Sequence, residues 1–437
     1  REACQGGRDM ADSADQHLLD TIIGGRFVND QPLVETMVRG AGQQVEDLRS
    51  YGIKYATAQT APRIASSMAP GHSRPRMVYG ENFFGTDFTF RLRKYALEQG
   101  IGFVEGILIT RLLKRRDNVV GAIGTDGRGE VVVFAAPATV LASGGIGQAY
   151  LRTDTVGGAT GDGYALAYEA GATLKDMEFV QFYAVTMGLG TPSLDYESLL
   201  LDTGGKLLNR NEEDIVLKHD LADPMLLTRD RLAQAMAKEV LGGRGVEGMV
   251  VLDLADIPSD RMEILGPTLP KAALRGARRF LVAPAVHFHM GGVKIDEGAR
   301  TCVPGLYAAG EVCGGVHGAN RLSGNALVEA WVFGSIAGRE AARMAEETGP
   351  ACPPADEIET EARRLKELAS RQDGERVELL RSALKETMWN RVGVIRDAGG
   401  LRQALNEIAA LQERYRRVCL PEGRALQAAV RLGNMLF

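Results

Sequence analysis

The chain lacks three features that would assign it to a specialised class of proteins. It has no run of roughly 18 apolar residues able to cross a bilayer, and its net charge of −5 excludes the basic excess typical of nucleic-acid binders. Its five cysteines show neither metal-site nor disulfide spacing. We therefore expect no transmembrane segment of its own, no nucleic-acid partner, and a reducing, cytoplasmic location. The longest apolar run, 131–142, contains Pro137 and is interpreted as buried strands.

What is present is ordinary globular composition, with 45% hydrophobic and 24% charged residues among 437. That length accommodates two or three domains. The first residues, REACQGG, show no initiator Met and no signal-peptide pattern, and the last, RLGNMLF, stop within a helical pattern. We interpret both ends as truncations.

The order of periodic segments predicts three domains. Helical spacing dominates 8–60 and 87–100, strands follow over 102–142, and a turn leads into a helix at 160–172. The strand–helix alternation is interrupted after residue 177, returns at about residue 286, and ends at a Pro-rich linker, 349–357. The predicted units are a ligand-binding domain in two parts (1–177 and 286–348), an inserted second domain (178–285) and a helical domain (355–437).

Two predicted strands end in similar residues, VLASGG (140–145) and GLYAAGE (305–311). Small residues at the carboxyl end of a strand let a flat or phosphorylated ligand approach the backbone. Glu311, one residue beyond the glycine, is suited to accept hydrogen bonds from a sugar or ribityl hydroxyl. Ordinary tight turns are the alternative for either strand alone, but TGDG (160–163) adds a third glycine-rich turn and favours a ligand site.

The segment 310–327 places an acid, an arginine and several glycines between a strand and a long helix. The helix begins at Asn325, and its first amide groups form a seat for an anion or for the negative edge of a reduced flavin. Arg321 offers a planar fork to a carboxylate. The alternative for Arg321 is a solvated loop arginine.

Taken together, the motifs resemble the flavoprotein subunits of succinate dehydrogenase, fumarate reductase and L-aspartate oxidase. The resemblance spans nearly the whole chain. The matching segments are QGG (5–7), DSADQHLLDTI (12–22), HSRPR (72–76), VLASGG, TGDGYALAYEAGA, MEFVQF (177–182), HFHMGG (287–292), the segment from 305 to 327, and MWNRVGVIR (388–396).

The resemblance implies an α/β fold: a Rossmann-like FAD-binding domain whose first βαβ element is missing, an inserted α+β capping domain and a C-terminal helical domain. It also implies FAD as the cofactor. The implied FAD contacts are Gln5, Gly6, Gly7, Ser143, Gly144, Gly145, Asp162, Glu311, Asn325, Ala326 and Leu327. The histidine that carries covalent FAD in respiratory members would fall just before Arg1, so the mode of attachment stays open.

For the substrate, the resemblance implies that His287 and Arg321 hold a dicarboxylate over the flavin. His289, two residues beyond His287, is expected to point away from His287 and to take a packed structural role. His317 lies where the family has a loop histidine, and we favour a structural role for it.

Three positions depart from the family pattern. Tyr183 replaces a substrate histidine, and it either hydrogen-bonds a substrate, serves as an acid or lines the pocket. The segment SLLLDTGGKLLN (198–209) lacks the usual acid and arginine of the proton pathway. Gln234 stands where we place the catalytic arginine, and a glutamine cannot donate the proton that fumarate reduction needs. Arg231, nearly one turn away, would replace it only along a different path.

The sequence therefore predicts an FAD-dependent oxidoreductase that transfers hydride between flavin N5 and a small carboxylate substrate not handled like fumarate. One alternative is a true succinate dehydrogenase or fumarate reductase subunit with rearranged proton donors. Another is a flavin electron-transfer subunit without dicarboxylate turnover. The resemblance further implies an iron–sulfur electron-transfer partner, and through it a peripheral place on the inner membrane.

Overall fold

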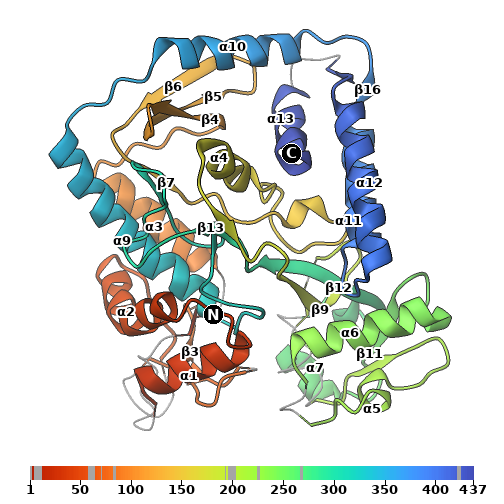
Figure 1. Ribbon diagram of the computed structural model, residues 1–437. Helices are drawn as coiled ribbons and strands as arrows, with labels where there is room; N and C mark the ends of the chain where they lie inside the picture. The colour runs from red at the N-terminus through yellow and green to blue at the C-terminus, as the bar shows by residue number, and fades with distance from the viewer. Residues whose placement is uncertain are drawn as a thin grey trace.

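The computed structural model places the chain as helices and several small sheets (Figure 1). The residues that it describes are 2–3, 12–57, 64–69, 71–81, 85–191, 193–194, 203–223, 227–265, 269–420 and 425–437. The predicted cofactor residues Gln5, Gly6 and Gly7 lie outside these ranges. Within them, no helix is long and apolar enough to cross a membrane.

Three helices near the N-terminus build one side of the molecule: α1 (Ala14–Gly24), α2 (Gln31–Ser50) and α3 (Thr86–Glu98). Ser13 caps α1 by accepting a hydrogen bond from the Gln16 amide, which satisfies one of the helix's free donors. The buried face of α2 repeats at helical spacing and packs on the long helix α9 (Asn325–Thr348). Small strands lie beside these helices, β1 (Glu2–Ala3), β2 (Ser66–Ser67) and β3 (Met77–Val78).

The two glycine-ended strands are neighbours. Strands β7 (Thr139–Leu141) and β14 (Leu306–Ala308) pair in parallel, so that their carboxyl ends meet at one edge. This pairing brings VLASGG and GLYAAGE together, as their shared chemistry suggests. Nearby lie α4 (Asp162–Ala170), β8 (Leu174–Lys175), β13 (Gly292–Lys294) and β15 (Cys313–Gly314).

A three-stranded antiparallel sheet consists of β4 (Leu108–Arg115), β5 (Asn118–Thr125) and β6 (Val131–Ala135). The prediction that 131–142 forms buried strands was wrong for β6. That strand lies at the edge of its sheet, and its residues alternate between exposed and half-buried. The first predicted strand also starts later than expected, because the structure has no strand over 101–107.

The segment predicted to be inserted builds its own sheet, in the order β10-β11-β12-β9. Its strands are β9 (Val180–Met187), β10 (Lys206–Leu208), β11 (Val250–Asp253) and β12 (Arg279–His289). Helix α6 (Arg229–Glu239) packs on β9 and β12, and the buried side chains form a hydrophobic core separate from the larger one around α2 and α9. Short helices complete it, α5 (Ile215–Lys218), α7 (Ser259–Leu265) and α8 (Lys271–Leu274).

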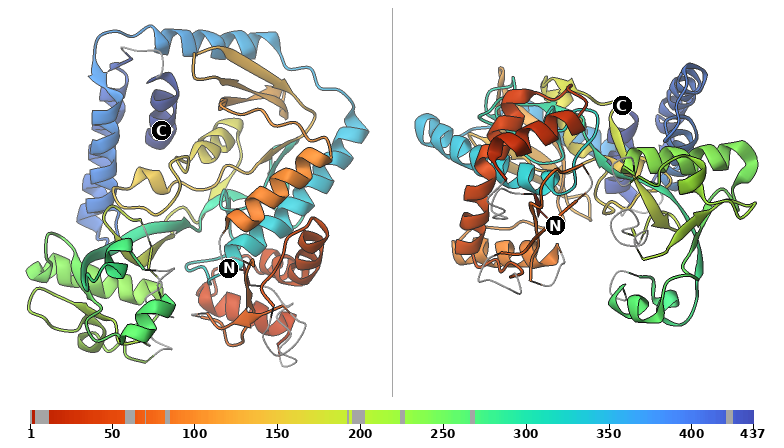
Figure 2. Two further views of the ribbon diagram at one scale, coloured as in Figure 1. Left: turned by 180° about the vertical axis from the view of Figure 1, so that it is seen from behind. Right: turned by 90° about the horizontal axis from the view of Figure 1, so that it is seen from below.

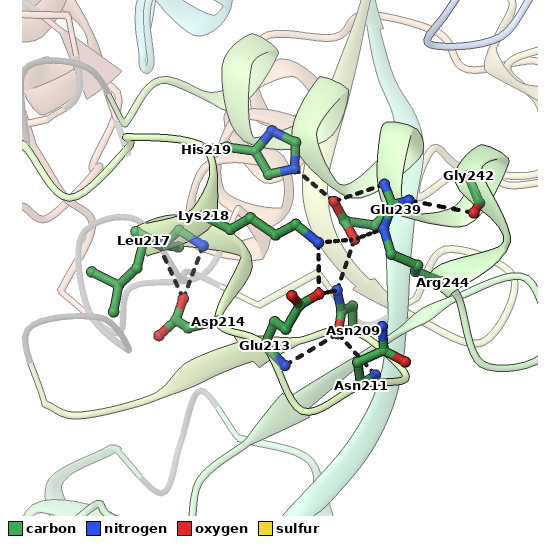
Figure 3. A network of polar contacts seen from close by, with 11 residues as sticks. Asn209, Asn211, Glu213, Asp214, Leu217, Lys218, His219, Glu239, Gly242 and Arg244 are labelled. Carbon is green, nitrogen blue, oxygen red and sulfur yellow. Dashed lines mark hydrogen bonds and ion pairs between the residues drawn. The ribbon is translucent and has the colours of Figure 1, made fainter.

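A buried carboxylate ties the pieces of this segment together (Figure 3). The side chain of Glu239, at the end of α6, accepts hydrogen bonds from Arg244 at 2.6 Å, Asn209 at 2.8 Å and His219 at 2.8 Å. Lys218 adds a longer contact of 3.3 Å. Because every oxygen of this buried group has donors, the charge is compensated, and the arrangement joins β10, α5 and α6.

Four helices follow α9: α10 (Ala355–Ala369), α11 (Val377–Arg391), α12 (Ala398–Tyr415) and α13 (Leu426–Leu436). Two short strands, β16 (Glu375–Arg376) and β17 (Val418–Cys419), pair between them. Figures 1 and 2 show α11 and α12 running side by side along one flank, with α13 turned inward toward α4. The predicted helical C-terminal part is therefore present, and Asn434 joins it to Asp162 with a 2.7 Å hydrogen bond.

Candidate functional site

Arg321 lies buried in the loop that precedes α9, where the sequence analysis expected a carboxylate-binding fork. Its Nε donates to Gln181 Oε1 at 3.1 Å, and its guanidinium carbon lies 4.9 Å from the centre of the Phe288 ring. Gln181 in turn donates to the Arg321 carbonyl at 2.8 Å. Burial and the nearby charge of Arg229 lower the pKa of Arg321 to about 9. This strand-to-loop contact holds the arginine rigidly at the meeting point of the two cores.

Arg229 reaches the same place from the first residue of α6. Its guanidinium carbon lies 4.5 Å from the centre of the Tyr183 ring, and the ring of His287 meets that tyrosine edge-on at 5.0 Å. Tyr183 is buried and contacts both residues, and the three roles considered for it remain predictions. The cleft between α6 and the loop before α9 is lined by Gly71, Gln181, Thr228, Arg229, Asn320, Arg321, Leu322 and Ser323.

The structure does not bring Gln234 to this cleft. Its side chain is exposed on α6, on the face shared with Arg231 and Lys238, whereas Leu232 and Met236 are buried against the sheet. The arginine that enters the cleft from this helix is Arg229, which the sequence analysis did not single out. The last residue of the motif Arg-Asp-x-x-x-Arg is therefore not the one that enters the cleft, because it lies on the solvent face of α6.

His287 lies on β12, and its ring contacts that of Tyr183. Its Nδ1 lies 2.8 Å from Oδ2 of Asp154, and the same oxygen accepts a 2.5 Å hydrogen bond from the Ser193 hydroxyl. Burial lowers the pKa of His287, whereas Asp154 opposes that shift. Asp154 carried no signal in the sequence, because 133 positions separate it from its partner.

Glu311 lies at the carboxyl edge of β14, facing the glycines that follow β7. Its Oε1 accepts the backbone amide of His289 at 3.0 Å, and burial raises the pKa of this carboxyl to about 7. A Cβ at Gly145 would fall 2.1 Å from that oxygen, so only glycine permits this close approach. Gly144 adds a backbone φ of +73°, which glycine also favours.

At the start of α9, backbone groups rather than side chains are available to contact a ligand. The Asn325 side chain is buried and committed to α1, with its Oδ1 2.9 Å from His17 Nε2 and its Nδ2 3.0 Å from Thr21 Oγ1. Ala326 and Leu327 follow in the first turn, and Leu327 is exposed. An exposed leucine and a helix start without a side-chain cap, beside glycine-rich strand ends, suit a flat, partly anionic ligand.

Two other predicted cofactor residues lie at the start of α4 and in the turn after β7. Asp162 begins α4, but its carboxylate accepts from Thr160 at 2.7 Å and from Asn434. These bonds give it a structural task between α4 and α13. The side chain of Ser143 is exposed in the turn after β7, where a Cβ on Gly163 would fall 1.9 Å from its hydroxyl oxygen.

A buried cluster of charges supports the loop before α9. Arg76 is fully buried and donates to Asp12 at 2.6 Å and to Asp20 at 2.6 Å, and it also contacts His72. His72 Nε2 lies 2.8 Å from the carbonyl oxygen of Ser323. The segments 12–22 and 72–76 therefore support the site indirectly: through His72, the cluster that they form contacts the backbone of the loop that contains Arg321.

The two histidines expected to be structural are both packed. His289 lies 3.0 Å from the carbonyl of Gly291 through Nδ1 and contacts the ring of Tyr164. His317 is buried with Glu329, 2.8 Å away, beneath Phe288. Both positions agree with the interpretation made from the sequence. Among the described residues, no three His, Cys, Asp or Glu side chains gather as a metal site.

Comparison with known families gives two matches along the chain. Residues 3–327 match the FAD binding domain family, and residues 381–436 match the fumarate reductase flavoprotein C-terminal family. An uncharacterised FAD-dependent oxidoreductase of Methanocaldococcus jannaschii is 36% identical, over 97% of this chain and 79% of that protein. A fumarate reductase (CoM/CoB) subunit of Methanothermobacter marburgensis is also 36% identical, over 98% and 80%.

Among solved structures, a variant of E. coli quinol fumarate reductase FrdA superposes with a TM-score of 0.89. That match has 26% identity and covers 100% of this chain and 79% of the other. The agreement extends through the FAD-binding part and the C-terminal helices.

Proposed function

Because the chain belongs to the flavoprotein family of fumarate reductase, succinate dehydrogenase and L-aspartate oxidase, we propose that it moves hydride between its flavin and a small carboxylate substrate bound beside Arg321, Arg229 and His287. The protein is an FAD-dependent oxidoreductase, and FAD is its cofactor. When bound, FAD supplies the hydride acceptor or donor. Glu311, the glycines after β7 and the amides at the start of α9 are the described groups that would hold it.

The observation that carries the substrate class is a pair of arginines in one cleft. Arg321 donates to Gln181 and to the Leu322 carbonyl, and it forms no ion pair within the described ranges. Arg229 lies close enough to lower its pKa. The carboxylates of Glu311 and Asp154 raise the pKa of Arg321 but do not offset the lowering by burial and Arg229, so an added anion beside the two arginines would be stabilised. A carboxylate satisfies both, because each guanidinium presents paired donors in a plane.

Tyr183 and Gln181 set the orientation of the two arginines. The face of Tyr183 supports Arg229, and Gln181 fixes the Nε edge of Arg321. The remaining N–H donors of the two guanidinium groups are then held in fixed orientations. This lowers the entropic cost of binding a rigid dicarboxylate. The ring of His287 contacts Tyr183 and lies near both arginines.

The test compares two arginines on one helix, in the FAD-loaded protein. Fumarate, succinate and aspartate are titrated separately while the flavin absorption spectrum is recorded. Arg229→Gln should weaken binding on the order of tenfold to a hundredfold, since a charge-assisted hydrogen bond contributes about 1.5–3 kcal/mol. Arg231→Gln, on the exposed face of α6, should change binding less than about twofold. If none of these ligands perturbs the wild-type flavin, the carboxylate proposal is wrong.

A second candidate is an electron-transfer flavoprotein that turns over no dicarboxylate. It is favoured by Tyr183, whose ring fills the space between Arg229 and His287. Related proteins are named as subunits, and we propose an iron–sulfur protein as the electron partner of this chain. Flavin reduction by such a partner, together with a spectrum insensitive to all three ligands, would select this candidate.

A further inference from the structure

Asp154 is a buried carboxylate that the backbone holds beside His287. Its side chain is 7% exposed, and its own amide donates to the Val286 carbonyl at 3.1 Å, one residue before the histidine. Thr153 adds a hydroxyl bond of 2.9 Å to the same carbonyl, and the Val286 amide returns a 3.0 Å bond to Arg152. The carboxylate is therefore fixed relative to the ring by backbone contacts on both sides.

The contact sets the chemistry of the imidazole. A carboxylate accepts hydrogen bonds, so Nδ1 of His287 must carry the proton in the 2.8 Å contact with Asp154. Nε2 is then an acceptor in the neutral ring and a donor in the protonated ring, while the Nδ1 bond stays in place. Ser193 donates to the same oxygen of Asp154 and so steadies the carboxylate as an anion.

The other charges around the ring oppose its protonation. Burial lowers the pKa of His287 most, and the positive charges of Arg321, from the loop before α9, and Arg229, from α6, lower it further. Tyr183 meets the ring edge-on from β9. Asp154 is the charged group that favours the imidazolium, and a bound dicarboxylate would add to its effect.

We propose that Asp154 is a positioning residue for the substrate site: it holds the Nδ1–H of His287, directs Nε2 to the cleft, and allows the ring to take up a proton when a carboxylate binds. This inference rests on the proposed function. Binding of a dicarboxylate is then accompanied by uptake of one proton at Nε2, and Nε2 donates a hydrogen bond to the ligand's carboxylate oxygen.

The direct test is nitrogen NMR of the FAD-loaded protein labelled at its histidines. The chain has six histidines, and the signal lost in His287→Gln assigns His287. The wild-type ring should be in the Nδ1–H form when neutral. Finding Nε2–H in the wild type would overturn the proposal without any Asp154 variant.

Asp154→Asn should abolish the Nδ1–H preference and move the titration of His287 to lower pH, because the negative charge is gone. Dicarboxylate affinity should fall about tenfold to a hundredfold, because the ring loses the charge-assisted hydrogen bond that orients it. Ser193→Ala keeps the carboxylate and should keep the Nδ1–H form. Unchanged signals from the other five histidines report an intact fold.

Asp154→Glu, which restores a charge on a longer side chain, should recover part of the titration shift. An Asp154→Asn protein with the wild-type tautomer and titration would refute the positioning role. Failure of the proposed function looks different: the wild-type flavin would ignore dicarboxylates, whereas the His287 tautomer would still be measurable.

Discussion

Glu311 has to serve two opposed requirements at the edge of the strand pair. Burial between β14 and the glycines after β7 raises the pKa of its carboxyl to about 7, so ionising it is unfavourable in the folded protein. A ribityl hydroxyl, however, is best bound by the ionised form. The residue therefore lowers the stability of the apoprotein above pH 7 in return for a stronger hydrogen bond to the cofactor.

Glu311→Gln separates these two effects. A carboxyl whose folded pKa exceeds its unfolded value contributes stability at low pH and loses it as pH rises through about 7. At pH 8 the apoprotein of the variant should therefore be more stable than the wild type by about 1–3 kcal/mol. Its affinity for FAD should fall, measured by quenching of flavin fluorescence. The control, Glu297→Gln at an exposed turn, should change neither quantity; a destabilised Glu311→Gln apoprotein would contradict the argument.

Residues carried by local motifs were predictable, and those defined by long-range contacts were not. Glu311, Arg321 and His287 each stand in a recognisable string, and Arg321 lies close enough to act electrostatically on the other two; their roles toward substrate and cofactor remain predictions. Asp154 acquires its place only through pairing with β12, far along the chain. The side chain of Asn325 was expected near the cofactor, but the approach of α1 engages it instead.

At the scale of elements, α6 shows why a spacing motif alone misleads. The helix buries Leu232, Met236 and Glu239, so its solvent face contains Arg231 and Gln234. Five residues of helix correspond to a rotation of about 140° beyond one full turn, which separates Arg229 from Gln234 around the axis. The apolar periodicity of DRLAQAMAKEVL already indicated which face of the helix is exposed.

Gln234→Arg therefore tests the corrected position. An added guanidinium on the exposed face of α6 cannot reach the cleft, so fumarate reduction and the fumarate-induced change in the flavin spectrum should stay within about twofold of the wild type. The measurement is steady-state turnover with a reduced dye as electron donor. A large gain in reduction rate would restore Gln234 as the functional position. Arg231→Gln serves as the matched change on the same face.

The elements themselves were predicted unevenly. The helices α3, α4 and α9 follow clear apolar spacing, and the structure has them within a few residues of the expected bounds. The run 131–142 was taken as buried because it is apolar, yet β6 is an edge strand with Val131 and Val133 exposed. Whether an apolar strand is covered depends on its neighbours in the sheet, which its own residues do not specify.

At the scale of the whole molecule, the cleft lies where two hydrophobic cores meet. The larger core surrounds α2 and α9, and the second surrounds α6 and the sheet of β9 to β12. Arg321 belongs to the first part, whereas Arg229, Tyr183 and His287 belong to elements of the second. Changes in how the two parts sit together would alter the spacing of the two arginines, so stability of the second part matters for binding.

The network around Glu239 provides a way to weaken the second part alone (Figure 3). Glu239→Ala leaves Arg244, Lys218 and His219 without their shared acceptor and should destabilise this part of the chain; because these partners are partly exposed, the loss should be smaller than for a fully buried ion pair. Hydrogen exchange should rise over 206–253, whereas the amides of α2 and α9 keep their protection. Lys238→Ala, exposed on the same helix, is the matched control.

The same local opening is expected in the wild type at low pH. The hydrogen bond from Arg244 is the largest cause that lowers the pKa of Glu239, so the carboxylate's contribution is present above pH 4.5, its ordinary value, and is lost as pH falls below it. Exchange over 206–253 should therefore rise at low pH before that of α2.

If Glu239→Ala instead accelerates exchange equally in both cores, the two unfold as one unit, and a separate capping domain over 178–285 would be wrong.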